Sequence, residues 1–393
     1  MKKLLVLVLS IMFVAGAFTS AYATHGEVLA KMEGSKVILG GEARLRGVCA
    51  INHTDTNDDV DDDNCYWDQR VRLTVTGQIG DAEVRTRLDV GEGRWNNAAN
   101  TGGVTVDYAY LHIPVAGVVI DAGRQKASFG NKFYQDDVRK DRFQVSAKVG
   151  DATIGAYSDK RSENVDLVVP FPGEGFLNND VDDYGIFAVY KAGDMEGGAL
   201  VVFRNDDQVD NNDGTDATAY VSTKVGNVGV KGELTMQTDD FNYVNADEDT
   251  KWGGFVSAEM GMDAVTVGGL VAFTTNGYVA DKHFIPTVMI GKDQISAMDN
   301  FGDRGDSVLG VLSASYKATP ELSVGGKVAY ASYDTYPDNN TDSSAVEIDA
   351  GLRYQISKGV TYDVALGYLI PDDFSSTDDN AISVMNQFKI NFN

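Results

Sequence analysis

Arginine side chains recur at every second position in three short segments near the start of the chain. They are Arg44 and Arg46, Arg70 and Arg72, and Arg85 and Arg87. Mostly apolar residues lie between them, and the side chains of a β-strand point alternately to its two faces. The pattern therefore predicts three strands that are apolar on one face and basic on the other. Guanidinium groups attract anions and form charge-assisted hydrogen bonds, so the chemistry indicated is electrostatic.

Acidic residues share the basic faces of these strands. Glu42, Glu83 and Asp89 stand at alternate positions with the arginines in the run from Glu42 to Asp89. We expect them to supply counter-charges, because like charges crowded on one face repel one another.

The same two-residue period continues along the chain. With the first three segments it predicts about 18 strands, each near the ~9–11 residues of a tilted membrane strand. Alternation is weak in 104–114, 182–192 and 307–317, so 16 strands are an alternative. The later segments are 104–114, 117–125, 141–149, 151–159, 182–192, 196–205, 216–225, 228–238, 251–262, 264–275, 307–317, 320–333, 345–357, 359–369 and 381–392.

Short and long connections alternate strictly between these segments. The short ones lie at 80–81, 115–116, 150, 193–195, 226–227, 263, 318–319 and 358. The long ones are 49–65, 93–103, 126–140, 160–181, 206–215, 239–250, 276–306, 334–344 and 370–380. Outer-membrane barrels have this asymmetry, with short periplasmic turns and long extracellular loops. A sheet in lipid must also close on itself to pair its edges. The sequence predicts an all-β fold, a closed antiparallel transmembrane barrel, in preference to a soluble solenoid or sandwich.

The N-terminus has the features of an export signal. Lys2 and Lys3 precede an apolar run over 4–17, and Ala21-Tyr22-Ala23 offers a small-x-small cleavage site. We expect residues 1–23 to be a signal peptide and 24–393 to be the barrel. An uncleaved anchor is the alternative.

Negative charge is concentrated in the long connections. The net charge is −25, and the acidic clusters argue against nucleic acid as a partner. Solvated loops explain them, and Ca²⁺ binding by these loops is the alternative. We otherwise expect no cofactor.

Two cysteines, Cys49 and Cys65, flank the first acidic connection. In an oxidising compartment they are expected to form a disulfide. A metal site is the weaker alternative, because no histidine pair accompanies them.

Two motifs resemble those of the Gram-negative outer-membrane porins. The final strand, 384–392, is similar to the alternating segment with an aromatic end that such proteins present to their assembly machinery, although here Asn393 follows Phe392. The stretch 122–130 is similar to the porin segment that leaves the fifth strand and enters the third long loop. The likeness covers essentially the whole chain after the signal.

The resemblance implies a water-filled channel for small hydrophilic solutes and ions, embedded in outer-membrane lipid as a homotrimer. It implies that the third loop, 126–140, folds into the lumen and brings its acids opposite the basic wall. Whether anions or cations are preferred is open at this stage. The pore-lining or constriction residues expected are Arg44, Arg46, Arg70, Arg72, Glu83, Arg85, Arg87, Arg124, Lys126, Asp136 and Asp137.

Two other functions compete with this expectation. A barrel sheath around an outer-membrane cytochrome is one, although the chain has no Cys-x-x-Cys-His haem motif. An outer-membrane enzyme is the other, but with four histidines no His–Ser–acid arrangement can be argued. The apolar part of loop 276–306 could fold into the mouth, pack on a neighbouring subunit or bind a partner.

Overall fold

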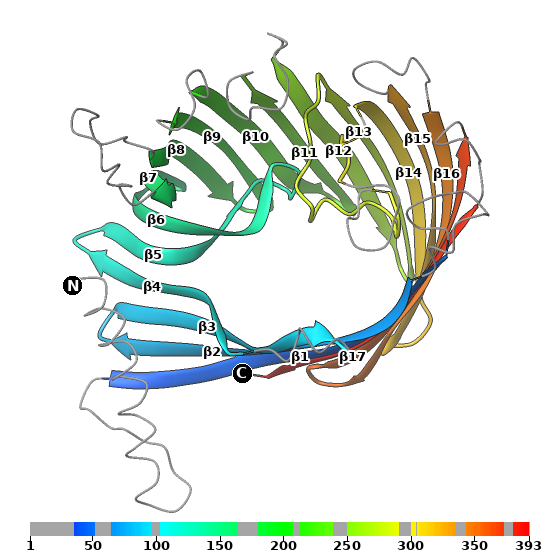
Figure 1. The fold of residues 1–393 in the computed structure, drawn as a ribbon, viewed down its shortest axis with the longest axis horizontal. Coiled ribbons are helices and arrows are strands. Elements are labelled where there is room, and N and C mark those ends of the chain that lie inside the picture. Colours follow the sequence, from blue (N-terminus) through cyan, green and yellow to red (C-terminus); the bar gives the residue numbers. More distant parts are fainter. Residues whose placement is uncertain are drawn as a thin grey trace, which may run out of the picture.

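The chain folds into a ring of antiparallel strands (Figure 1). The computed structural model describes residues 35–51, 64–95, 103–163, 180–206, 213–238, 250–290, 300–303, 305–334, 343–372 and 380–392. No helix among these residues is long and apolar enough to span a membrane. Residues 1–34 lie outside the described ranges, so the signal peptide stays a prediction.

Eighteen strands make up the sheet. They are β1 (Ser35–Ile51), β2 (Asn64–Ile79), β3 (Ala82–Arg94), β4 (Thr105–Val115), β5 (Val118–Phe129), β6 (Gln135–Val149), β7 (Ala152–Glu163), β8 (Asp180–Ala192), β9 (Met195–Asp206), β10 (Gly214–Val225), β11 (Val228–Gln237), β12 (Lys251–Met262), β13 (Val265–Thr275), β14 (Asp306–Lys317), β15 (Leu322–Asp334), β16 (Ser343–Ser357), β17 (Val360–Asp372) and β18 (Ala381–Phe392).

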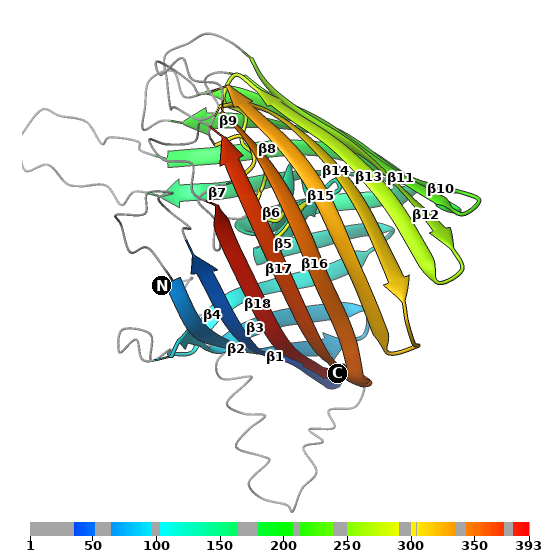
Figure 2. The ribbon, with the colours of Figure 1, turned by 90° about the vertical axis from the view of Figure 1, so that its right-hand side faces the viewer.

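The first and last strands close the barrel. β1 pairs with β18 from Gly41 opposite Phe392 to Ile51 opposite Ile382, and every other strand pairs with its neighbours in sequence. The start of β1 and the end of β18 therefore lie on the side of the short turns (Figure 2). The predicted closed barrel is confirmed with 18 strands, and the alternative of 16 is wrong.

Apolar side chains cover the outer face of the barrel. Val256 and Val271 are each 61% exposed and Leu312 is 72% exposed, whereas Glu347 on the inner face is 1% exposed. A membrane barrel places its apolar band toward lipid and its polar residues toward the lumen. The short turns fit tight hairpins: Gly80 and Gly226 have φ of 59° and 64°, a region that glycine adopts without steric strain.

Two segments lie inside the ring. The ends of β5 and β6 turn away from the wall into the interior (Figure 1). Residues 276–290, which we call the inner loop, pack beside their tip, residues 130–134. The predicted loop boundaries of 126–140 are wrong, because pairing continues through Gln125 opposite Lys140 and Ala127 opposite Val138. Only residues 130–134, the hairpin tip, connect the two strands.

The inner loop explains why 307–317 alternates weakly. Leu309 and Val311 on the inner face of β14 are buried in one cluster with Phe284 and Met289 of the inner loop. Both faces of β14 are therefore apolar, one toward lipid and the other toward the inner loop.

Candidate functional site

The arginines of β1, β2 and β3 share the inner face of the barrel, and we call these six residues the basic wall. The register places Arg44 opposite Arg70, and Arg87 opposite Thr74. Arg46 stands opposite Asp68, and Glu42 opposite Arg72. The structure thus brings together Arg44, Arg46, Arg70, Arg72, Arg85 and Arg87, as their spacing in the sequence predicts.

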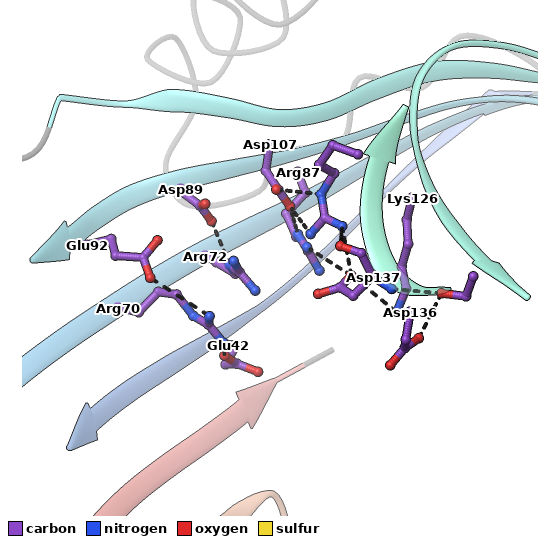
Figure 3. Close-up of polar contacts among 12 residues, drawn as sticks. Glu42, Arg70, Arg72, Arg87, Asp89, Glu92, Asp107, Lys126, Asp136 and Asp137 are labelled. Carbon is purple, nitrogen blue, oxygen red and sulfur yellow. Dashed lines mark hydrogen bonds and ion pairs between the residues drawn. The ribbon is translucent and has the colours of Figure 1, made fainter. Parts of the chain in front are cut away.

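Carboxylates hold the arginines in place (Figure 3). Arg70 Nη2 lies 2.7 Å from Glu42 Oε1, and Arg72 Nε lies 2.7 Å from Asp89 Oδ1. Arg85 Nε lies 2.6 Å from Glu83 Oε2. The counter-charges expected at Glu42, Glu83 and Asp89 are therefore in contact with the arginines of the wall.

Three further carboxylates of the wall are not predicted from the sequence: Asp68, Asp107 and Glu92, whose Oε1 lies 3.9 Å from Arg70 Nη1 (Figure 3). Asp68 contacts Arg46, with Nε to Oδ2 at 2.9 Å, and Asp107 pairs with Arg87. The β3–β4 register shifts between Arg87 and Leu88, so the position of Asp107 does not follow from the alternation. A bulge of this kind adds one residue to a strand and breaks its alternation.

Three carboxylates of the wall each serve two cations. Asp68 contacts Arg44 and Arg46, Glu42 contacts Arg70 and Lys389, and Asp107 contacts Arg87 and Arg139. Arg70 also lies 3.9 Å from Glu92, and Asp137 contacts Arg87, Arg139 and Lys126. Over all these ion pairs, the nine cationic side chains exceed the seven carboxylates by two: the cations are Arg44, Arg46, Arg70, Arg72, Arg85, Arg87, Lys126, Arg139 and Lys389, and the carboxylates are Glu42, Asp68, Glu83, Asp89, Glu92, Asp107 and Asp137.

The near end of the inward hairpin is tied to the basic wall. Arg139 Nε lies 2.7 Å from Asp107 Oδ1, and its Nη1 lies 2.8 Å from Asp137 Oδ1. Asp137 also lies 3.2 Å from Lys126 Nζ and 3.9 Å from Arg87 Nη2 (Figure 3). The acid of the hairpin thus contacts the wall directly, and no open passage separates the two at this point.

Asp136 and Arg124 take other positions. Asp136 Oδ1 accepts a hydrogen bond from Ser128 at 2.8 Å, and its other oxygen lies 3.5 Å from Lys132. Arg124 alternates along β5 with the inward-facing Asp121 and Gln125, so it lies on the opposite face of the strand. At this point β5 separates from β4. Arg124 forms its ion pair with Asp141 at 3.4 Å. Its side chain is 47% exposed and makes no ion pair with the basic wall within the described part of the chain.

Glu233 of β11 anchors the hairpin tip. Its Oε1 accepts a hydrogen bond from the Tyr134 amide at 2.7 Å, and its Oε2 accepts from the amides of Asn131 and Phe133. Gly130 adopts a φ of 84°, and a Cβ at this position would collide with the Glu233 carboxylate. The hairpin therefore runs across the lumen from the basic wall to β11.

Glu347 of β16 anchors the inner loop in the same way. It accepts hydrogen bonds from the Met289 amide at 2.7 Å, the Ile290 amide at 2.9 Å and the Thr287 hydroxyl at 2.7 Å. The side chain of Phe133 stacks on Tyr278, with ring centroids 5.8 Å apart and an interplanar angle of 4°. Hairpin tip and inner loop thus form one packed unit.

The side of the hairpin that faces β7–β10 is filled. Arg142 pairs with Asp159, and Arg204 with Asp183, while Tyr157 and Leu200 are buried beside them. The other side keeps free space. A recess of about 270 Å³ opens there, lined by residues that include Glu42, Arg72, Thr74, Thr76, Arg87 and Asn391.

No metal centre is evident in this site. In the described ranges no group of three or more histidine, cysteine, aspartate or glutamate side chains could hold a metal ion. Cys49 and Cys65 form a disulfide between directly opposite positions of β1 and β2.

Comparison with known proteins identifies the family. A model of the Gram-negative porins matches residues 8–373. The chain belongs to the Gram-negative porin family. It is an outer-membrane channel through which small solutes diffuse, and the cytochrome-sheath alternative is not favoured.

Solved porins share the fold at low sequence identity. OpdK of Pseudomonas aeruginosa, solved with vanillate, is 13% identical, with 90% of this chain and 98% of that chain covered and a TM-score of 0.61. A BenF-like porin from Pseudomonas fluorescens Pf-5 is 11% identical, with coverage of 90% and 98% and a TM-score of 0.60. OprD of Pseudomonas aeruginosa is 10% identical, with coverage of 90% and 93% and a TM-score of 0.57. No curated protein matches the chain.

Proposed function

We propose that the basic wall is the charge filter of this porin and that it favours small anions over cations. The observation that carries the proposal is the sharing of carboxylates. Asp68, Glu42 and Asp107 each contact two cationic side chains. A carboxylate compensates one positive charge, and over all these ion pairs of wall and hairpin nine cationic side chains meet seven carboxylates, which leaves a surplus of two positive charges. Fixed charge at a narrow part of a pore controls which ions enter it.

The inward hairpin supports the same proposal. It occupies the side of the lumen toward β7–β11, so solutes pass on the side where the basic wall and the recess lie. Lys126 adds a cation that is 45% exposed and close to Arg87 through Asp137.

A planar bilayer measurement tests the filter. In a KCl gradient centred on about 1 M, the Debye length is about 3 Å, so the charges of the acidic outer loops are largely screened. We expect the reversal potential to show a chloride preference. The double variant Arg44→Gln/Lys389→Gln removes the second cation from Asp68 and from Glu42, and should bring the chloride-to-potassium permeability ratio close to one.

Arg124→Gln is the matched control, because its side chain lies away from the wall. It removes one arginine charge from the same chain and should leave the ratio unchanged. A wild-type channel that prefers potassium, or a double variant that behaves as wild type, would contradict the proposal.

The proposal includes no catalytic residue and no cofactor, since the family and fold indicate a channel rather than an enzyme. Ca²⁺ binding by the acidic loops stays a prediction, and most of those residues lie outside the described ranges. Assembly as a homotrimer also stays a prediction, which the mass of the detergent-solubilised protein would test.

A further inference from the structure

The recess beside the basic wall has the features of a binding site for a solute. It lies between β1, β2 and β18 on the inner face of the barrel. Its volume is about 270 Å³. Sites for drug-sized ligands measure about 300–1,000 Å³, so the recess suits a smaller molecule.

Four polar side chains that line the recess keep hydrogen-bonding groups that no described residue uses. The hydroxyls of Thr74 and Thr76 and the amide of Asn391 make no hydrogen bond to any described side chain or backbone group. Arg72 donates to Asp89 through Nε, and neither of its terminal nitrogens has a partner in the described residues. A guanidinium has five N–H donors, so those of the terminal nitrogens remain available to a ligand.

The acid that lines the recess is already engaged. Glu42 lies 2.7 Å from Arg70 and 2.7 Å from Lys389, one cation at each oxygen. Its charge is therefore compensated, and the recess as a whole is electropositive. A carboxylate is the small anionic group that an arginine fork binds with two parallel hydrogen bonds.

An apolar side chain completes the recess. Ile38 stands opposite Thr76 and thus faces the lumen, where it is 46% exposed. Next to it on the same face, Gly40 has no side chain and leaves room above the wall. An exposed isoleucine on a polar inner face offers contact to the hydrocarbon part of a solute.

We propose that the recess binds a small carboxylate with a short aliphatic chain during its passage. The carboxylate contacts the terminal nitrogens of Arg72, the hydroxyls of Thr74 and Thr76 hydrogen-bond its oxygens, and the chain packs on Ile38. This inference rests on the proposed anion filter, and it adds a solute class and a saturable site to it.

Butyrate is the probe. Added to one side of a bilayer that carries single channels in KCl, it should reduce the chloride current with a saturable concentration dependence. Butyramide, which is neutral and of nearly the same shape, should not. Ile38→Asn should raise the half-blocking concentration about three- to tenfold, since about one to two buried methylene groups lose their contact.

Variants separate the recess from the filter. Ile38→Asn should keep the chloride preference, because it changes no charge, and Thr74→Val should raise the half-blocking concentration as well. Thr86→Val on the outer face of β3 is the matched control, and butyrate should block this variant at the wild-type half-blocking concentration. Heat-modifiable migration in gels shows that each variant has folded.

A butyrate effect without saturation, or equal half-blocking concentrations in wild type and Ile38→Asn, would contradict binding in the recess. Neither result would affect the proposed charge filter. The opposite outcome is a channel that shows no chloride preference but a saturable butyrate block that Ile38→Asn weakens. That outcome would support binding in the recess and overturn the charge filter.

Discussion

Glu233 and Tyr134 are 99 residues apart in the sequence, and the Tyr134 amide donates a 2.7 Å hydrogen bond to the Glu233 carboxylate. This contact joins the tip of the β5–β6 hairpin to β11. Together with the ion pairs from Arg139 and Lys126 at the other end, it fixes the hairpin across the lumen. The Glu233 carboxylate is therefore one of the contacts that set the width of the passage beside the basic wall, together with the packing of Phe133 on Tyr278.

Glu233→Gln should loosen the hairpin tip. The amide nitrogen of the new side chain would face at least one backbone N–H, and a buried donor without an acceptor is destabilising by about 1–3 kcal/mol. We expect noisier open-channel currents and entry of larger polyethylene glycols than in wild type. Glu196→Gln, at an exposed pair with Lys191, is the control. Equal polymer cut-off and noise in wild type and Glu233→Gln would contradict the anchoring role.

Gly130→Ala should have the same effect as Glu233→Gln. A left-handed conformation destabilises a residue with a Cβ by about 1–2 kcal/mol, and here the Cβ would also press on the Glu233 carboxylate. In a double-mutant cycle that compares the size of the largest polyethylene glycol that enters the pore, the effects of the two changes should be non-additive, because both act on one contact. Gly150→Ala is a matched control, with a φ of 61° but open space around it. Additive effects would show that the two residues act separately.

Glu347→Gln should expose the inner loop to solvent exchange. The carboxylate accepts from two backbone amides and one hydroxyl, and a carboxamide cannot accept from all three in the same geometry. Hydrogen exchange of the Met289 and Ile290 amides should rise by about tenfold for each 1.4 kcal/mol lost. Glu321→Gln, in an exposed turn, serves as the control. Unchanged protection of the Met289 and Ile290 amides would contradict this prediction.

Removal of the disulfide should reduce stability without changing the pore. Cys49 and Cys65 are separated by 16 positions, and closing a loop of that length contributes about 3 kcal/mol in the chain-entropy model. Their side chains alternate with the inward-facing Arg46 and Asp68. The double variant Cys49→Ser/Cys65→Ser should unfold at lower temperature in detergent and keep the wild-type ion selectivity. Two free thiols in the native protein, or altered selectivity in the variant, would contradict this.

Much of the barrel could be predicted because alternation reports which face of a strand meets lipid. The segments 228–238, 345–357 and 359–369 alternate clearly, and each is a strand of nearly the expected length. Alternation fails where the inner face is covered. In β14, Leu309 and Val311 lie under the inner loop, and in β8, Phe187 packs near the hairpin beside Phe129. The weak alternation of 182–192 and 307–317 thus indicates that segments inside the barrel pack on these strands.

The candidate site was predictable in part, for a related reason. The wall arginines follow from local spacing, whereas Asp107 requires knowledge of a register shift and Arg124 requires knowledge of where β5 leaves β4. Glu233 and Glu347 look like ordinary lumen residues in the sequence. Their role depends on contacts with segments 57–102 positions away, which no local pattern reveals.

If the basic wall controls ion passage, the chloride-to-potassium permeability ratio of single channels depends on its charge and tests that control most directly. In about 0.1 M KCl, where the Debye length is about 10 Å, Arg87→Gln should lower that ratio about two- to threefold, since a unit charge about 7 Å away then stabilises an anion and destabilises a cation by about 0.3 kcal/mol each. Arg124→Gln, an arginine that contacts Asp141 and not the wall, should leave the ratio at the wild-type value. Equal ratios in wild type and Arg87→Gln, or a larger change in Arg124→Gln, would contradict the claim.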